Sequence, residues 1–131
     1  MLAMGVVVAG LVLGGCADRT TYVAAGRTGL EARYDGVDVE VDLPANVPVP
    51  SVVAAGEQVL LRRGHTITAS QATGQRGRVV GRPGSRRLHR KVEVDARQIP
   101  GATRVWVKVQ PGGDEAASRS ILEDMLIRMG F

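Results

Sequence analysis

Two neighbouring segments in which apolar and polar residues alternate constrain the fold of this chain more than any other feature. Apolar residues occupy every second position through most of residues 88–97, and residues 103–110 repeat the pattern. Successive side chains of a strand point to opposite faces of its sheet, so each segment predicts a strand with one buried face. The turn signal Pro100-Gly101 separates them. We therefore expect an antiparallel pair.

The same periodicity predicts further strands. Residues 37–43 alternate valine or leucine with acidic residues. Residues 66–73 are rich in β-branched side chains and precede Gly74, after which residues 76–81 contain two valines, a pattern typical of a hairpin. Residues 30–34, before the turn pair Asp35-Gly36, are a candidate for an additional strand.

Helical periodicity is present in two other segments. Residues 49–60 place apolar residues on one stripe that includes Gly56, and Gly64 is suited to the left-handed C-terminal cap. We expect Gly56 to let this helix lie close to a sheet. Asp114 is suited to cap a second helix, which ends at Gly130.

The predicted order is strand, helix, four strands, helix. It favours the α+β class, with an antiparallel sheet of about five strands and both helices packed on one face, because each strand has one apolar face and each helix one apolar stripe. By analogy, this order resembles the helix-grip and TATA-binding-protein-like arrangements. We expect residues 30–131 to form this single domain.

The N-terminal segment has the composition of an export signal. Residues 1–15 carry no charge and are largely apolar, and they end at the chain's only cysteine. The motif Leu13-Gly14-Gly15-Cys16 resembles the lipobox of bacterial lipoproteins. That resemblance implies cleavage before Cys16, a diacylglyceryl group on its thiol and acylation of the new amino terminus, so that the lipid is the only attached group we expect. Residues 16–29, which are small and polar, are then expected to be a flexible tether.

One feature of the segment departs from an export signal, and two alternatives to this interpretation remain open. Export signals normally begin with a basic residue, and none precedes Cys16, which a true start at Met4 or upstream would explain. The first alternative is an ordinary cleaved signal with an incidental cysteine, and the second is a buried apolar strand of a cytosolic protein.

As a lipoprotein, the chain would be held in the bacterial cell envelope. The periplasmic face of the outer membrane is favoured over the inner membrane because Ala17, rather than aspartate, follows the cysteine.

The C-terminal third resembles a family of small bacterial lipoproteins described only as a domain of unknown function. The resemblance lies in the sequence Thr-Arg-Val-Trp-Val-Lys-Val at 103–109, followed by Gly-Asp-Glu-Ala-Ala-Ser-Arg at 113–119. It implies a lipidated envelope protein. The family has no established catalytic residue that could be assigned to a position in this chain.

Charge is distributed very unevenly along the chain. Residues 62–91 contain nine Arg or Lys and no Asp or Glu, whereas residues 31–57 contain six acidic residues and one arginine. The candidate anion-binding residues of the basic stretch are Arg76, Arg78, Arg82, Arg86, Arg87, Arg90 and Lys91. Arginine binds phosphate and carboxylate in a bidentate manner, which suits lipid head groups or cell-wall polymers. A solvated loop that balances the acidic segment is the alternative.

A second candidate surface surrounds the single tryptophan. Trp106 shares one predicted strand face with Arg104 and Lys108 and could contact a partner there, unless the tether or Tyr22 covers it.

The residues point to no metal site or catalytic centre. Neither His65 nor His89 has other ligands at suitable spacing, and no serine stands in a nucleophile motif. We therefore expect a non-enzymatic, membrane-anchored module that binds an envelope protein or an anionic polymer. A nucleic-acid-binding domain, suggested by a pI near 10.0, is opposed by export and by the scarcity of aromatic residues. A hydrolase with an unrecognised site is the third hypothesis. The oligomeric state is left open.

Overall fold

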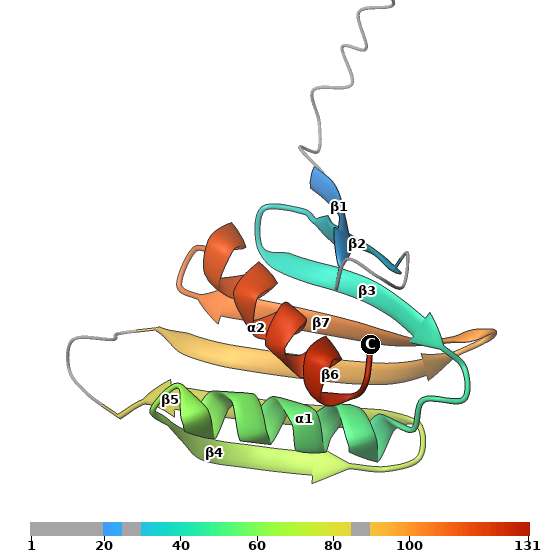
Figure 1. The fold of residues 1–131 in the computed structure, drawn as a ribbon. Helices are drawn as coiled ribbons and strands as arrows, with labels where there is room; N and C mark the ends of the chain where they lie inside the picture. Colours follow the sequence, from blue (N-terminus) through green and yellow to red (C-terminus); the bar gives the residue numbers. More distant parts are fainter. Residues whose placement is uncertain (1–19, 25–29, 85–89) are drawn as a thin grey trace, which may run out of the picture.

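A computed structural model describes residues 20–24, 30–84 and 90–131 of the chain (Figure 1). These residues form an α+β fold of seven strands and two helices. The elements in chain order are β1 (Thr20–Ala24), β2 (Leu30–Tyr34), β3 (Asp38–Pro44), α1 (Val49–Arg62), β4 (His65–Ala72), β5 (Arg76–Pro83), β6 (Lys91–Ile99), β7 (Ala102–Gln110) and α2 (Glu115–Arg128).

All described strands belong to one sheet in the order β1-β2-β3-β7-β6-β5-β4. Every neighbouring pair is antiparallel. Two meanders, β1-β2-β3 and β4-β5-β6-β7, are joined by the pairing of β3 with β7. Both helices lie on the same face of the sheet (Figure 1). α1 packs on β4, β5 and β6, and α2 packs mainly on β7 and β3 and against α1.

The core lies between this face and the helices. It is built from the apolar residues of the alternating strands, such as Val41, Val94 and Val107, together with Leu60 of α1 and Leu122 of α2, all at most 1% exposed. Burial of aliphatic side chains is the main stabilising contribution available, at about 25 cal/mol per Å² of apolar surface.

The local signals for helix ends are confirmed. Asp114 caps α2, with its Oδ1 accepting a hydrogen bond from the Ala117 N–H at 3.0 Å. Gly64, after α1, has a φ of +85°, the left-handed conformation that glycine adopts most readily. No helix in the described part of the chain is long and apolar enough to cross a membrane.

Two expectations need correction at the N-terminal side of the sheet. The sheet has seven strands rather than about five, because residues 30–34 do form a strand and β1 adds another. Thr20–Ala24, which fall within the predicted tether of residues 16–29, are β1 and pair with β2 from Thr20↔Tyr34 to Ala24↔Leu30. The free backbone groups at the β2 edge supply the hydrogen bonds for this short strand, and its Thr-Thr-Tyr-Val residues favour extended structure.

The glycines that allow α1 to lie close to the sheet are in strand β5, whereas the sequence predicted that Gly56 of the helix would do this. A Cβ atom at Gly56 would lie 3.5 Å from Val94 Cγ1, which is an ordinary contact. A Cβ atom at Gly77 of β5 would lie only 2.4 Å from Val53 Cγ2, and one at Gly81 would lie 3.0 Å from Leu60 Cδ1. The strand, rather than the helix, therefore provides the space for α1.

Candidate functional site

The face of the sheet opposite the helices carries polar side chains arranged in cross-strand rows. Side chains directly opposite in antiparallel strands have Cβ atoms about 5 Å apart, so the register decides which groups meet. One row holds three arginines: Arg104 of β7 is opposite Arg97 of β6, which is opposite Arg76 of β5. Asp42 of β3 ends this row beside Arg104.

Arg104 is neutralised by carboxylates from β3. Its Nε and Nη2 atoms lie 2.7 and 3.0 Å from the two carboxylate oxygens of Asp42, and Nε is 3.1 Å from Glu40 Oε1. The hydrogen bonds from Arg104 lower the pKa of Asp42 below its ordinary value, despite the opposing effect of burial. Arg104 is therefore already paired and is poorly available to a ligand.

The other two arginines of the row lack such compensation. Arg76 and Arg97 are both exposed, and neither forms an ion pair with any of the residues that the structure describes. Like charges directly opposite each other destabilise a sheet. A bound anion between the two guanidinium groups would remove that repulsion and accept charge-assisted hydrogen bonds.

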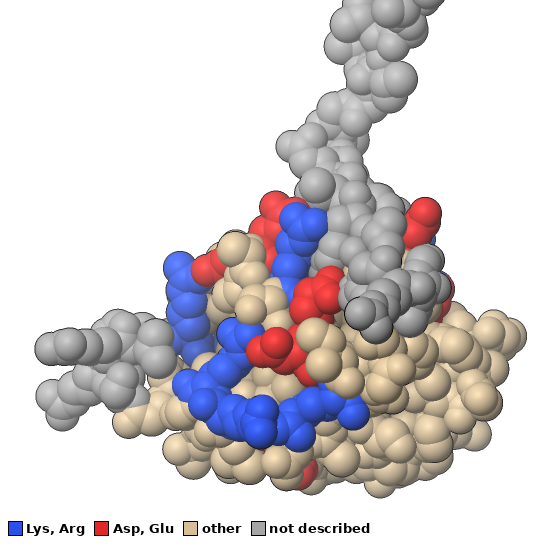
Figure 2. Space-filling view, in the orientation of Figure 1, with Lys and Arg blue, Asp and Glu red and all other residues tan. Residues whose placement is uncertain are grey.

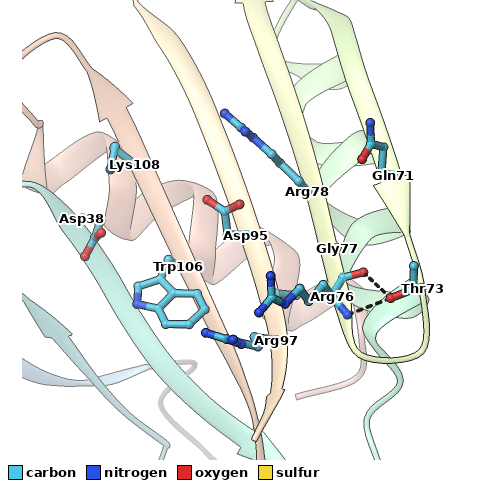
Figure 3. A pocket seen from close by; sticks show the side chains of 11 residues that line it. Asp38, Gln71, Thr73, Arg76, Gly77, Arg78, Asp95, Arg97, Trp106 and Lys108 are labelled. Atoms are coloured by element: carbon cyan, nitrogen blue, oxygen red, sulfur yellow. Dashed lines mark hydrogen bonds between the residues drawn. The ribbon is translucent and has the colours of Figure 1, made fainter.

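Trp106 lies beside this arginine pair in the neighbouring row, between Glu40 and Asp95. Its indole Nε1 donates to Glu40 Oε2 at 3.2 Å, and Glu40 is held in turn by Arg33 Nη2 at 2.7 Å. The nitrogen side of the ring is thereby fixed toward β3. Figure 3 shows the six-membered ring extending toward Arg97.

Together these groups line a hollow of about 610 Å³ on the helix-free face. Its lining includes Trp106, Lys108, Asp38, Asp95, Gln71, Thr73 and the arginines 76, 78 and 97 (Figure 3). Arg78 is partly compensated, since its Nη2 lies 2.8 Å from Glu93 Oε1. A volume of this size is in the usual range for small-ligand sites, roughly 300–1,000 Å³.

Asp95 is the most perturbed acid of the hollow. Burial, followed by the charge and hydrogen bond of Glu93, raises the pKa of Asp95 from its ordinary value of 3.8 to about 6. A raised carboxyl pKa means that the folded chain binds the proton more tightly than the unfolded chain. The contribution of Asp95 to stability therefore falls as pH rises from about 4 through about 6, while the hollow becomes less positive.

The helix-covered side presents its charges differently. In Figure 2 a band of basic side chains crosses that side with acidic side chains bordering it. Two arginines next to the helices are paired: Arg63 Nη2, just after α1, lies 2.6 Å from Asp124 Oδ2 of α2, and Arg90 pairs with Asp114, which caps α2. The described residues contain no group of three or more His, Cys, Asp or Glu arranged to hold a metal ion.

The structure brings together parts of two separately predicted sets. Arg76 and Arg78 of the basic stretch share the hollow with Trp106 and Lys108 of the sheet-face set. Of the remaining candidates, Arg82 is exposed on β5 and Lys91 begins β6, both away from the lining. The predictions on Leu13-Gly14-Gly15-Cys16, Arg86 and Arg87 lie outside the described residues.

Sequence reasoning missed Arg97 and Asp95 as site residues. Both stand in the alternating segment 88–97, where they look like ordinary solvent-facing residues of a half-buried strand. The available signal was the hairpin itself, because pairing β6 with β5 places Arg97 opposite Arg76 and Asp95 opposite Arg78.

No protein-family model matches this chain, and no curated protein matches it either.

Proposed function

We propose that this chain is a non-enzymatic lipoprotein of the bacterial envelope that binds an anionic envelope ligand on the helix-free face of its sheet. The observation that carries the binding proposal is the pair Arg76 and Arg97, which are opposite each other beside Trp106 in a hollow of about 610 Å³ and have no carboxylate partner among the described residues. The lipobox-like motif at Cys16 supports the anchor. Two or three acyl chains make such an anchor effectively permanent.

The anchor is tested by comparing the full chain with Cys16→Ser. Intact-mass analysis of the membrane fraction is expected to show the added mass of about three acyl chains in the wild type and none in the variant. The variant is expected to leave the membrane fraction. Equal mass and equal membrane association of both chains would refute lipidation.

The binding face is tested separately with non-lipidated chains carrying Cys16→Ser. The double variant Arg76→Gln/Arg97→Gln is compared with Arg62→Gln/Arg128→Gln, which removes the same charge from two exposed helix arginines. Retention on isolated envelopes is expected to fall about 10-fold for the first pair, since charge-assisted hydrogen bonds contribute about 1.5–3 kcal/mol. The second pair is expected to change retention by less than about twofold, within the range of exposed charges. Equal retention of both pairs would contradict the proposed face.

A further inference from the structure

We infer that the hollow binds a saccharide unit carrying one carboxylate, with the acid between Arg76 and Arg97 and the sugar ring against Trp106. This inference rests on the proposed anion-binding function and specifies its ligand. It combines three neighbouring features: the arginine pair, a fixed aromatic ring, and acidic and amide side chains within the same lining.

The mixture of charges in the lining favours one anionic group over a polyanion. Asp38 and Asp95 line the hollow together with four basic residues. Arg78 is paired with Glu93, and Lys108 stands opposite Asp38, so Arg76 and Arg97 supply the positive charge that no described carboxylate pairs. Successive phosphates of a nucleic acid or a lipid surface would be repelled by these carboxyl groups. A sugar ring next to a single carboxylate avoids that repulsion, because its hydroxyl groups can donate hydrogen bonds to Asp38 and Asp95.

Trp106 offers an apolar surface of suitable size beside the arginine pair. The hydrogen bond from Nε1 to Glu40 holds the nitrogen side of the ring toward β3, and the six-membered ring extends toward Arg97 (Figure 3). Aromatic rings combine apolar area with low conformational entropy, so the C–H groups of a sugar ring can pack on them without further ordering of the site. Among the described residues that line the hollow, Trp106 is the only aromatic one, which fits one sugar ring rather than a run of stacked bases.

The rim of the hollow supplies a further polar group for sugar hydroxyls. Gln71 of β4 is exposed and stands opposite Arg78. Its amide can both donate and accept. The backbone around it is held by the β4–β5 turn, where Thr73 Oγ1 accepts from the Arg76 N–H at 3.0 Å and the Thr73 N–H donates to the Arg76 carbonyl at 2.7 Å. Gln71 is therefore held on the β4 side of the hollow, level with Arg78 and one row away from Arg76 (Figure 3).

The test uses the full chain carrying Cys16→Ser in a polyoxyethylene detergent, which contains no sugar. The probes are α-1,4-digalacturonate with one of its two carboxyl groups methyl-esterified, called digalacturonate below, and its neutral counterpart α-1,4-galactobiose. Trp106 is the chain's only tryptophan, so its fluorescence reports binding at the hollow directly. We expect the acidic disaccharide to bind at least about 10-fold more tightly than the neutral one, and Arg97→Gln to remove this preference. Equal binding of the two sugars by the wild type would overturn the inference.

Trp106 itself is tested by calorimetry, because its replacement removes the fluorescence signal. Trp106→Leu is expected to weaken digalacturonate binding about 10-fold, whereas Trp106→Phe, which keeps an aromatic face, stays within about threefold of the wild type. Thermal unfolding of both variants checks that the fold is retained. Equal affinities of the Leu variant and the wild type would contradict the ring contact.

Two further probes separate failure of this inference from failure of the proposed function. A single-stranded DNA 20-mer and phosphatidylglycerol vesicles present many phosphates. If Arg76→Gln/Arg97→Gln weakens binding to either of them while digalacturonate binds no better than galactobiose, the anion-binding face stands and the saccharide inference fails. If the double variant binds every probe as the wild type does, both fail.

Discussion

A methyl group added at Gly77 tests how α1 is seated on the sheet. The new Cβ atom would lie 2.4 Å from Val53 Cγ2 and 2.8 Å from Val49 Cγ1, well inside van der Waals contact. These valines are 5% and 0% exposed, and β-branched side chains in a helix have essentially one rotamer. Neither can therefore turn away. Gly56→Ala is the matched control, because its Cβ would meet Val94 at an ordinary 3.5 Å.

The two substitutions are expected to change the stability of the fold in opposite directions. Overpacking a closed core costs about 1–3 kcal/mol, and the two immobile contacts place Gly77→Ala in the upper half of that range, about 2–3 kcal/mol. Replacing a glycine within a helix by alanine gains up to about 1 kcal/mol, so Gly56→Ala is expected to be neutral or stabilising. For a domain of this size, the melting temperature of Gly77→Ala is expected to fall by about 10 °C or more.

Urea unfolding followed by far-ultraviolet circular dichroism measures both variants on one scale. The slope of the free energy of unfolding against urea concentration is expected to be the same for the wild type and both variants. A shift in the urea midpoint then reports a change in stability alone. If Gly77→Ala unfolds within about 0.5 kcal/mol of the wild type, or if Gly56→Ala is the more damaging substitution, the packing of α1 against β5 is not as described.

Three other predictions follow from polar contacts. The contribution of Asp95 to stability is expected to fall by on the order of 1 kcal/mol as pH rises from about 4 to 6.5, because solvent screening of this half-buried group reduces the full value of about 3 kcal/mol. Urea titrations of the wild type and Asp95→Asn should therefore differ in their pH profiles by about this amount. Asp114→Ala should lower the free energy of unfolding by about 1 kcal/mol by removing the cap of α2, whereas Asp114→Asn should retain most of it. The buried Thr103 donates from Oγ1 to the Val47 carbonyl at 2.7 Å, so Thr103→Val should cost about 1–2 kcal/mol in chemical denaturation and Thr103→Ser clearly less.

Local sequence patterns predicted the elements that rely on local rules. Alternation located β3, β6 and β7 because each has one face against the helices and one facing away from them. The caps at Asp114 and Gly64 depend only on nearby backbone groups, and both were predictable for that reason. Strand β1 was not predicted, because a segment of five residues is too short to show clear alternation and its pairing depends on the edge that β2 presents.

The candidate site could not be predicted from local patterns, because it depends on which residues stand opposite each other in neighbouring strands. That Arg97 meets Arg76 while Arg104 meets Asp42 follows from the registers of three strand pairs. Alternation identifies the face of each residue and leaves its cross-strand neighbour undetermined. The raised pKa of Asp95 likewise requires its burial beside Glu93. The residue types were visible in the sequence, and their grouping was not.

The position of β1 sets how far the domain can reach if Cys16 carries the lipid. Only four Cα–Cα steps separate Cys16 from Thr20, the first residue of β1, and a fully extended chain covers at most about 14 Å over them. From β1 the sheet runs five strand spacings to β5, roughly 24 Å at about 4.8 Å each. An anchored copy would then hold its hollow within roughly 40 Å of the membrane surface, so its ligand must be available in that membrane-proximal layer.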